Sequence, residues 1–125
     1  INCETLDEYT TVSGCHDGFF HKYNIIHKRE IIIYENKLVV RDYLNRKISN
    51  TKIRFYLFPG IKVLKEKNKF KTMDGYFIRA NCNGGKILRK KSKWYPEFSI
   101  EKENNLLEIT MKNQICETIF DWYKK

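Results

Sequence analysis

Turn-forming residues interrupt this chain at short, regular intervals, and their spacing limits what it can fold into. Between the turns lie apolar or alternating runs of strand length; residues 51–58, for example, place Ile53, Phe55 and Leu57 on one face. No run keeps the 3.6-residue period of a helix. The sequence therefore predicts an all-β fold, an antiparallel β-sandwich of about ten short strands in a single domain over residues 1–125.

Three of the expected turns join adjacent strands as hairpins, because Asn, Asp and Gly tolerate the backbone angles of tight turns. The connections are Glu35-Asn36 between 24–34 and 37–43, Asp74-Gly75 before 75–81, and Asn83-Gly84 between 76–81 and 85–90. Asn83-Gly84 is the strongest hairpin signal in the chain. Pro59-Gly60 is a further turn, followed by expected strands at 61–67 and 69–72.

The last third of the chain predicts three more strands, at 93–101, 105–112 and 115–123, separated by turns at Asn104-Asn105 and Asn113-Gln114. Trp94, Phe98 and Ile100 share a face in the first of them. The strand at 115–123 is apolar on both faces, which is typical of a strand covered on both sides. The first dozen residues are polar enough for an edge strand or a frayed end.

Charge and composition restrict the partners. The formal net charge of +9 favours an anionic partner, which could be nucleic acid, an anionic membrane surface or an acidic polysaccharide. No apolar run approaches the roughly 20 residues that span a bilayer. The chain begins at Ile1 and carries no secretory signal, so we expect a fragment of a longer protein or a processed chain. A periplasmic or secreted location would then require a signal outside this sequence.

Four cysteines are present, at positions 3, 15, 82 and 116, without a CxxC pair. An even number permits disulfides, but small buried side chains are the favoured interpretation. Zinc sites usually draw their ligands from closely spaced pairs. We therefore expect no metal and no cofactor in this chain.

All three histidines fall within residues 16–27, but their spacing matches no common metal motif. His27 and Arg29 share a face of a predicted strand, and Asp42 lies on its hairpin partner, so a cross-strand Arg29–Asp42 pair is expected. Two interpretations stay open. The pair fixes the hairpin register, or His27 and Arg29 form a positive edge that meets a carboxylate or sulfate of a sugar.

A basic cluster immediately precedes Trp94 and Tyr95, and this combination suits an anionic polymer. The alternative is a lysine-rich edge strand that resists aggregation. No activated nucleophile, paired carboxylates or phosphate-binding loop is recognisable, so no catalytic residue is assigned. The candidate substrate-binding residues are His27, Arg29, Lys86, Arg89, Lys90, Lys91 and Lys93.

The order of several motifs resembles the C-terminal region of heparinase II/III-like proteins. The motifs are His16-Asp17-Gly18-Phe19, His27-Lys28-Arg29, Val39-Val40-Arg41-Asp42 and an aromatic strand closed by Pro59-Gly60. The segment WYPEFSIEKENNLLEI resembles the last strands of that family. The resemblance spans roughly residues 14 to 123, and Phe58 stands where many members have His before the Pro-Gly turn.

The resemblance implies a polysaccharide lyase that combines an N-terminal α/α toroid with C-terminal β-sheets and acts by β-elimination at a uronic acid. The family's catalytic residues, and any structural metal, would then lie upstream of this region, and this chain alone would be inactive. The implied partners are an acidic polysaccharide and the toroid, without a membrane. A stand-alone anionic-glycan-binding module is the alternative. A nucleic-acid-binding domain is favoured only by charge, since no recognition motif is present.

Overall fold

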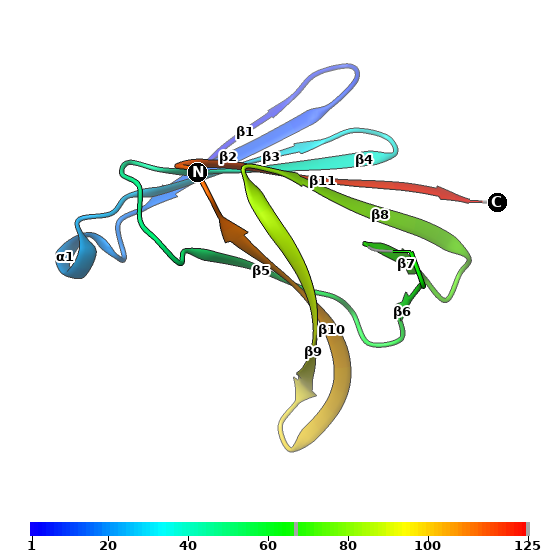
Figure 1. Ribbon diagram of the computed structural model, residues 1–125. Helices are drawn as coiled ribbons and strands as arrows, with labels where there is room; N and C mark the ends of the chain where they lie inside the picture. The colour runs from blue at the N-terminus through cyan, green and yellow to red at the C-terminus, as the bar shows by residue number, and fades with distance from the viewer. Residues whose placement is uncertain (67, 125) are drawn as a thin grey trace.

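The computed structural model describes residues 1–66 and 68–124, which form two antiparallel β-sheets and one helical turn (Figure 1). The strands are β1 (Asn2–Thr5), β2 (Thr10–His16), β3 (His27–Ile33), β4 (Lys37–Leu44), β5 (Lys52–Tyr56), β6 (Lys62–Val63), β7 (Lys69–Lys71), β8 (Tyr76–Asn83), β9 (Gly85–Glu97), β10 (Ile100–Met111) and β11 (Ile115–Lys124). The large sheet has the order β1-β2-β3-β4-β11-β8-β7-β6, and the small sheet has the order β5-β10-β9. The all-β prediction is confirmed.

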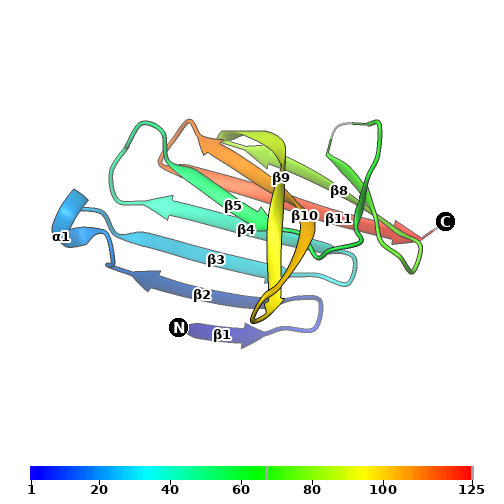
Figure 2. The ribbon, with the colours of Figure 1, turned by 90° about the horizontal axis from the view of Figure 1, so that it is seen from below.

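The two sheets pack face to face over a core of two clusters that share Phe55 and Ile87 at their border. Seen from below, β5, β9 and β10 lie in front of the large sheet (Figure 2). The core side chains belong to both sheets, and the most deeply buried of them include Val40, Phe70, Leu107, Ile109 and Cys116. Alternation explains this arrangement, because every second residue of a half-buried strand faces the core.

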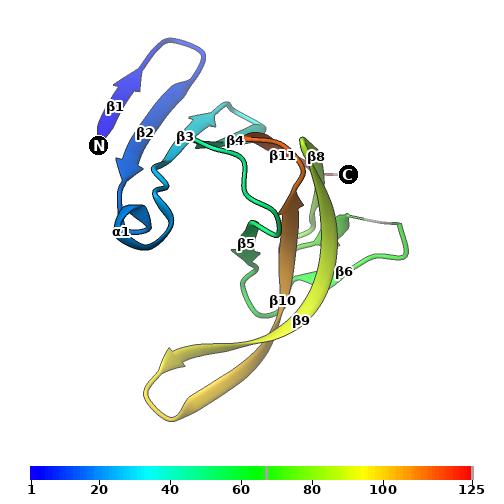
Figure 3. The ribbon, with the colours of Figure 1, turned by 60° about the vertical axis from the view of Figure 1, so that its left-hand side comes forward.

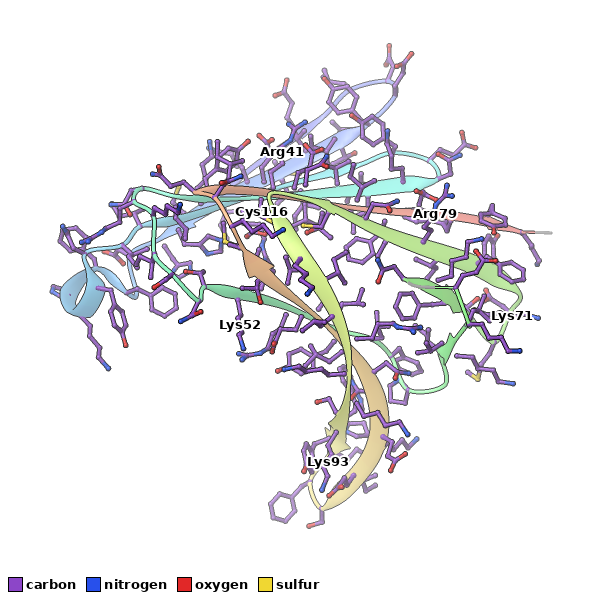
Figure 4. The ribbon with its side chains drawn as sticks, viewed as in Figure 1. Arg41, Lys52, Lys71, Arg79, Lys93 and Cys116 are labelled. Atoms are coloured by element: carbon purple, nitrogen blue, oxygen red, sulfur yellow. The ribbon has the colours of Figure 1, made fainter. Side chains whose placement is uncertain are left out.

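No described residue forms a layer over the outer face of the large sheet. Ile115 on that face is exposed, and Ile119 is half-buried. The expectation that both faces of the last strand are covered is therefore wrong for the described residues. A network of ion pairs lies on the same outer face, where Arg41 binds Glu30 at 3.1 Å and Glu117 at 2.7 Å; Figure 4 shows Arg41 on the side away from the small sheet.

Two of the three expected hairpins are present. β3 and β4 pair directly around Glu35-Asn36, with Arg29 opposite Asp42. β7 and β8 pair around Asp74-Gly75, where Gly75 has φ +93°. The N-terminal strand β1 forms one edge of the large sheet, as one of the two expectations for the first dozen residues proposed.

Asn83-Gly84 does not close a hairpin, and this prediction is wrong. The chain passes there from β8 in the large sheet to β9 in the small sheet. Gly84 has φ +84°, and a Cβ on it would lie 2.3 Å from the Ile115 carbonyl oxygen. A Cβ on Gly85 would lie 2.7 Å from a methyl carbon of Ile109. The two glycines are required because the crossing chain runs directly against the turn between β10 and β11.

The expected turn at Asn104-Asn105 is also wrong, because β10 runs through it. The side chain of Asn104 donates to the Leu57 carbonyl at 3.0 Å and that of Asn105 to the Ile61 carbonyl at 3.3 Å. These amides hold the loop after β5 rather than bend their own backbone. Lys67, the last residue of the expected strand 61–67, lies outside the described residues; β6 covers Lys62–Val63 within it.

The turn of the last hairpin lies instead at Phe98 and Ser99, where Ser99 has φ +66°. β9 and β10 consequently form a long hairpin that extends beyond the sandwich (Figure 3). Phe98 is 99% exposed at its tip and does not share a packed face with Trp94, contrary to the expectation from the pattern. We call the part of this hairpin from Lys91 to Glu103 the arm.

In the part of the chain that the structure describes, helical structure is limited to α1 (Phe20–Tyr23), a single turn that the sequence pattern did not predict. It follows β2 and ends at Asn24, whose φ of 55° allows the chain to reverse. No helix of the described residues is long and apolar enough to cross a membrane.

Candidate functional site

A buried carboxylate, that of Asp42, organises the candidate site. Arg29 on the neighbouring strand donates from Nε to Oδ1 at 2.8 Å and from Nη2 to Oδ2 at 3.3 Å. His27 Nε2 lies 2.6 Å from Oδ1. Because an ionised carboxylate only accepts hydrogen bonds, His27 carries a proton on Nε2. The predicted Arg29–Asp42 pair is present, and His27 joins it.

These contacts decide the charge of Asp42. Burial acts to raise the pKa of Asp42, but the hydrogen bonds from His27 and Arg29 outweigh it and lower the pKa below its ordinary value. The carboxylate is therefore a fixed negative charge at neutral pH. It already accepts three hydrogen bonds from His27 and Arg29, so it is suited to positioning these side chains rather than to accepting a proton from a substrate.

The hydrogen-bonded chain continues from His27 to the exposed end of β2. His27 Nδ1 lies 3.0 Å from Nε2 of His16, and Nδ1 of His16 accepts the backbone N–H of Gly18 at 3.3 Å. With Nε2 of His27 bound to Asp42, Nδ1 of neutral His27 accepts from His16. Both imidazoles then have the same tautomer, with the proton on Nε2.

A cavity of about 790 Å³ opens beside these residues. Its lining includes Tyr23 of α1, the helical turn at one end of the sandwich (Figure 1). Its walls come from α1 and the loop before it, from β3, from the loop between β4 and β5, and from β5 itself. Arg29, Lys52 and Arg54 bring positive charge to its lining, and Phe19 and Tyr23 bring aromatic rings. Cations beside aromatic faces are a common lining for sites that bind anionic sugars or other acidic ligands.

A second buried carboxylate, Glu108 on β10, connects this cavity to the basic strand. Lys90 of β9 reaches it at 2.9 Å, and Lys52 and Arg54 of β5 reach it at 3.3 and 3.1 Å. Figure 4 shows Lys52 on the side of β5 away from the large sheet. The hydrogen bond from Lys90, supported by those from Arg54 and Lys52 and opposed by burial, lowers the pKa of Glu108 to about 2.

The structure divides the basic cluster between the two faces of β9. Lys86 and Lys90 lie on one face and Arg89, Lys91 and Lys93 on the other, since successive side chains alternate along a strand. Besides the Lys90–Glu108 pair, Arg89 donates to the Leu64 carbonyl at 3.0 Å and Lys93 binds Glu101 at 2.9 Å. Among the described residues, neither Lys86 nor Lys91 forms an ion pair. β9 is the edge of the small sheet, as the alternative interpretation of this cluster requires.

Sequence patterns did not select Lys52, Arg54 or Glu108, although a signal for the two cations was present. Lys52 and Arg54 flank the buried Ile53, so alternation places both on the polar face of β5. Glu108 has no such signal, because it lies between the core residues Leu107 and Ile109 and its partners come from other strands. Over residues 1–66 and 68–124, no group of three or more His, Cys, Asp or Glu side chains is arranged to hold a metal ion.

Comparison with known proteins adds the decisive observation. The family model described as heparinase II/III-like, C-terminal, matches residues 2–123. The chain belongs to this family. The resemblance found in its motifs is thereby confirmed, over nearly the whole sequence. No curated protein sequence matches the chain.

Two solved structures share the fold of this member of the heparinase II/III-like family. They are crystal structures of the heparan sulfate lyase HepC from Pedobacter heparinus and of a mutant of that enzyme. Each superposes with a TM-score of 0.72 at 16% identity, covering 99% of this chain and 21% of the HepC chain. This chain and the matching part of HepC therefore share a fold, and this chain spans about a fifth of the length of HepC.

Proposed function

We propose that this chain is the C-terminal β-domain of a polysaccharide lyase that cleaves a uronic-acid-containing polysaccharide by β-elimination. The family match over residues 2–123 carries this proposal. The catalytic groups would lie on an N-terminal α/α toroid outside this sequence. In support, the two buried carboxylates described above are both occupied by cations of the chain itself, so neither is free to act as a base.

The first role of the domain would be to support the rest of the parent protein. The arm is the surface suited to this role, because it presents Tyr95, Phe98 and Ile100 at 63%, 99% and 41% exposure. Large apolar side chains gathered on one exposed element commonly mark a contact with another protein surface. The toroid that the family resemblance implies is the partner expected there.

The second role would be to contact the acidic polysaccharide near the cavity. Arg29 uses Nε and Nη2 to hold Asp42, and no described residue occupies its Nη1. A carboxylate or sulfate could accept from that nitrogen without displacing Asp42. His27 would line the same surface. The remaining residues of the basic strand and the two cations of β5 would add to the positive field that attracts the polymer.

The test compares this chain with the complete parent protein on heparan sulfate and on a uronic-acid polymer without sulfate. Formation of the unsaturated product is followed by its ultraviolet absorbance. The parent should release product and the isolated chain should not. Product formation by the isolated chain would show that the catalytic groups lie within residues 1–125, and a parent inactive on every uronic-acid polymer would refute the lyase proposal.

A stand-alone anionic-glycan-binding module is the second candidate, favoured by Lys86 and Lys91, which lie on the exposed edge strand and form no ion pair with any described residue. Binding of glycan by this chain with no activity in any longer form of the protein would select it. Preference for nucleic acid over a sulfated glycan at equal salt would instead favour a nucleic-acid-binding domain.

A further inference from the structure

Two of the four cysteines lie against each other. Cys82 near the end of β8 and Cys116 at the start of β11 have their Sγ atoms 3.2 Å apart. The register pairs Cys82 with Thr118 and Asn83 with Glu117, so Cys116 is the diagonal neighbour of Cys82 across an antiparallel pair. Cys116 is completely buried and Cys82 is half-buried.

We propose that Cys82 and Cys116 form an intramolecular disulfide when the chain meets a low-molecular-weight disulfide such as oxidised glutathione. A disulfide bond is about 2.05 Å long, so the two sulfur atoms need to approach by a little over one ångström. The backbone packs closely around the sulfur atom of Cys116. The chain crosses to the small sheet at Gly84-Gly85, and a Cβ on Gly85 would lie only 3.3 Å from Sγ of Cys116.

The environments of the two thiols give the reaction an order. The hydrogen bond from Cys116 lowers the pKa of Cys82, and the same contact together with burial raises the pKa of Cys116. Cys82 is also the more accessible of the two sulfur atoms. It is therefore the nucleophile, because the thiolate is the attacking species in thiol–disulfide exchange.

In the first step the Cys82 thiolate attacks one sulfur of oxidised glutathione, the S–S bond of glutathione breaks, and one glutathione thiolate leaves. In the second step Cys116 attacks Sγ of Cys82, the S–S bond to glutathione breaks, and the second glutathione leaves as a thiol with the proton from Cys116. Two protein thiols are oxidised and one glutathione disulfide is reduced to two thiols. Electrons and protons balance without any further reactant.

The bond would act at a junction of the fold. It would join the last residues of β8 to the first residues of β11. This place lies next to Gly84-Gly85, where the chain crosses from the large sheet to the small sheet and the β9–β10 hairpin begins. Figure 4 shows Cys116 at this junction. The cross-link closes a loop with a sequence separation of 34 residues, which restricts the unfolded chain more than the folded one.

The other two cysteines provide an internal comparison. Cys3 on β1 lies opposite Val12 and Cys15 on β2 lies opposite Lys28, so the two are offset along neighbouring strands, away from Cys82 and Cys116, and both are exposed. Replacing them in a Cys3→Ser, Cys15→Ser chain leaves the proposed pair alone. This chain is incubated with oxidised glutathione, denatured, alkylated with a maleimide and weighed by mass spectrometry.

The expected product is a monomer that takes up no maleimide, has lost two hydrogen atoms and regains two reactive thiols with dithiothreitol. It should also unfold at a higher urea concentration than the reduced form. Adding Cys116→Ala should stop the reaction at a glutathione adduct on Cys82. Adding Cys82→Ala should instead leave Cys116 unmodified in the folded chain. Two reactive thiols after oxidation, or a dimer linked through Cys82, would overturn the proposal. Both results are measured on the chain that keeps Cys82 and Cys116, so they do not depend on how well a variant of either residue folds.

Discussion

The carboxylate of Asp42 and the imidazole of His27 lie 2.6 Å apart across the β3–β4 hairpin, in a place where the carboxylate has no contact with water. Arg29 completes the arrangement from two residues further along β3. The two sequence interpretations of the Arg29–Asp42 pair, that it fixes the hairpin register and that it supports a binding surface, are compatible, since one carboxylate positions both Arg29 and His27 at the cavity.

Replacing Asp42 with Asn should destabilise the chain by about 2–3 kcal/mol, because Arg29 and His27 lose a charged acceptor in a buried place. Urea unfolding followed by tryptophan fluorescence measures the change. Glu30→Gln is the matched control, since it removes a carboxylate from Arg41 on the exposed outer face and should cost less than about 1 kcal/mol. Equal losses would show that the burial of Asp42 contributes nothing to stability.

Acid should weaken the fold through Glu108. Its pKa is about 2 in the folded chain and 4.5 ordinarily, so between these values the unfolded chain binds more protons. The stabilisation by Glu108 is complete above about pH 4.5 and is lost as the pH falls towards 2. Glu108→Gln should therefore flatten the decrease of the urea midpoint with falling pH in this window. A profile as steep as that of the original chain would assign the acid sensitivity to other carboxylates.

Gly84 should tolerate no side chain. Gly84→Ala combines a strained φ with a Cβ placed 2.3 Å from the Ile115 carbonyl, and we expect a loss of about 3 kcal/mol or more. Gly14→Ala provides the comparison, because its nearest neighbour would lie 3.5 Å from the new Cβ, at Ile1. Circular dichroism and thermal unfolding of both variants distinguish a local clash from a general effect of removing glycine.

The division of the basic strand predicts unequal contributions to polyanion binding. Lys86→Gln with Lys91→Gln should lower the salt concentration at which the chain leaves a heparin column. Lys90→Gln with Lys93→Gln removes the same charge but should shift elution less, since these lysines are already held in ion pairs with Glu108 and Glu101. Equal shifts would mean that retention follows net charge alone.

The fold class followed from alternation and turn spacing because both are local. Glu35-Asn36 and Asp74-Gly75 join strands that pair with each other, so the local signal and the tertiary arrangement coincide. Asn83-Gly84 has the same local chemistry, but its glycines serve a close approach to Ile115, a residue about thirty positions away. The turn predicted at Asn104-Asn105 was wrong for a related reason, because the amides of these residues bind the loop after β5, which is distant in the sequence.

The candidate site was predictable to a similar extent. Arg29 and Asp42 were paired from hairpin register alone, since that register is fixed by two short strands and one turn. The Glu108 cluster joins β5, β9 and β10, and its pairing depends on which strands share the small sheet. No pattern within a single strand contains that information, and the same holds for the contact between Cys82 and Cys116.

The strand β11 lies at the centre of the large sheet, between β4 and β8, yet it is the last strand of the chain. During synthesis the edges of β4 and β8 that pair with β11 therefore stay without this partner until residues 115–124 have emerged. Pairing so distant in sequence makes folding slow. A chain shortened before β11 would keep two exposed strand edges that can pair with other molecules, so removal of residues 115–125 should cause aggregation rather than simple unfolding.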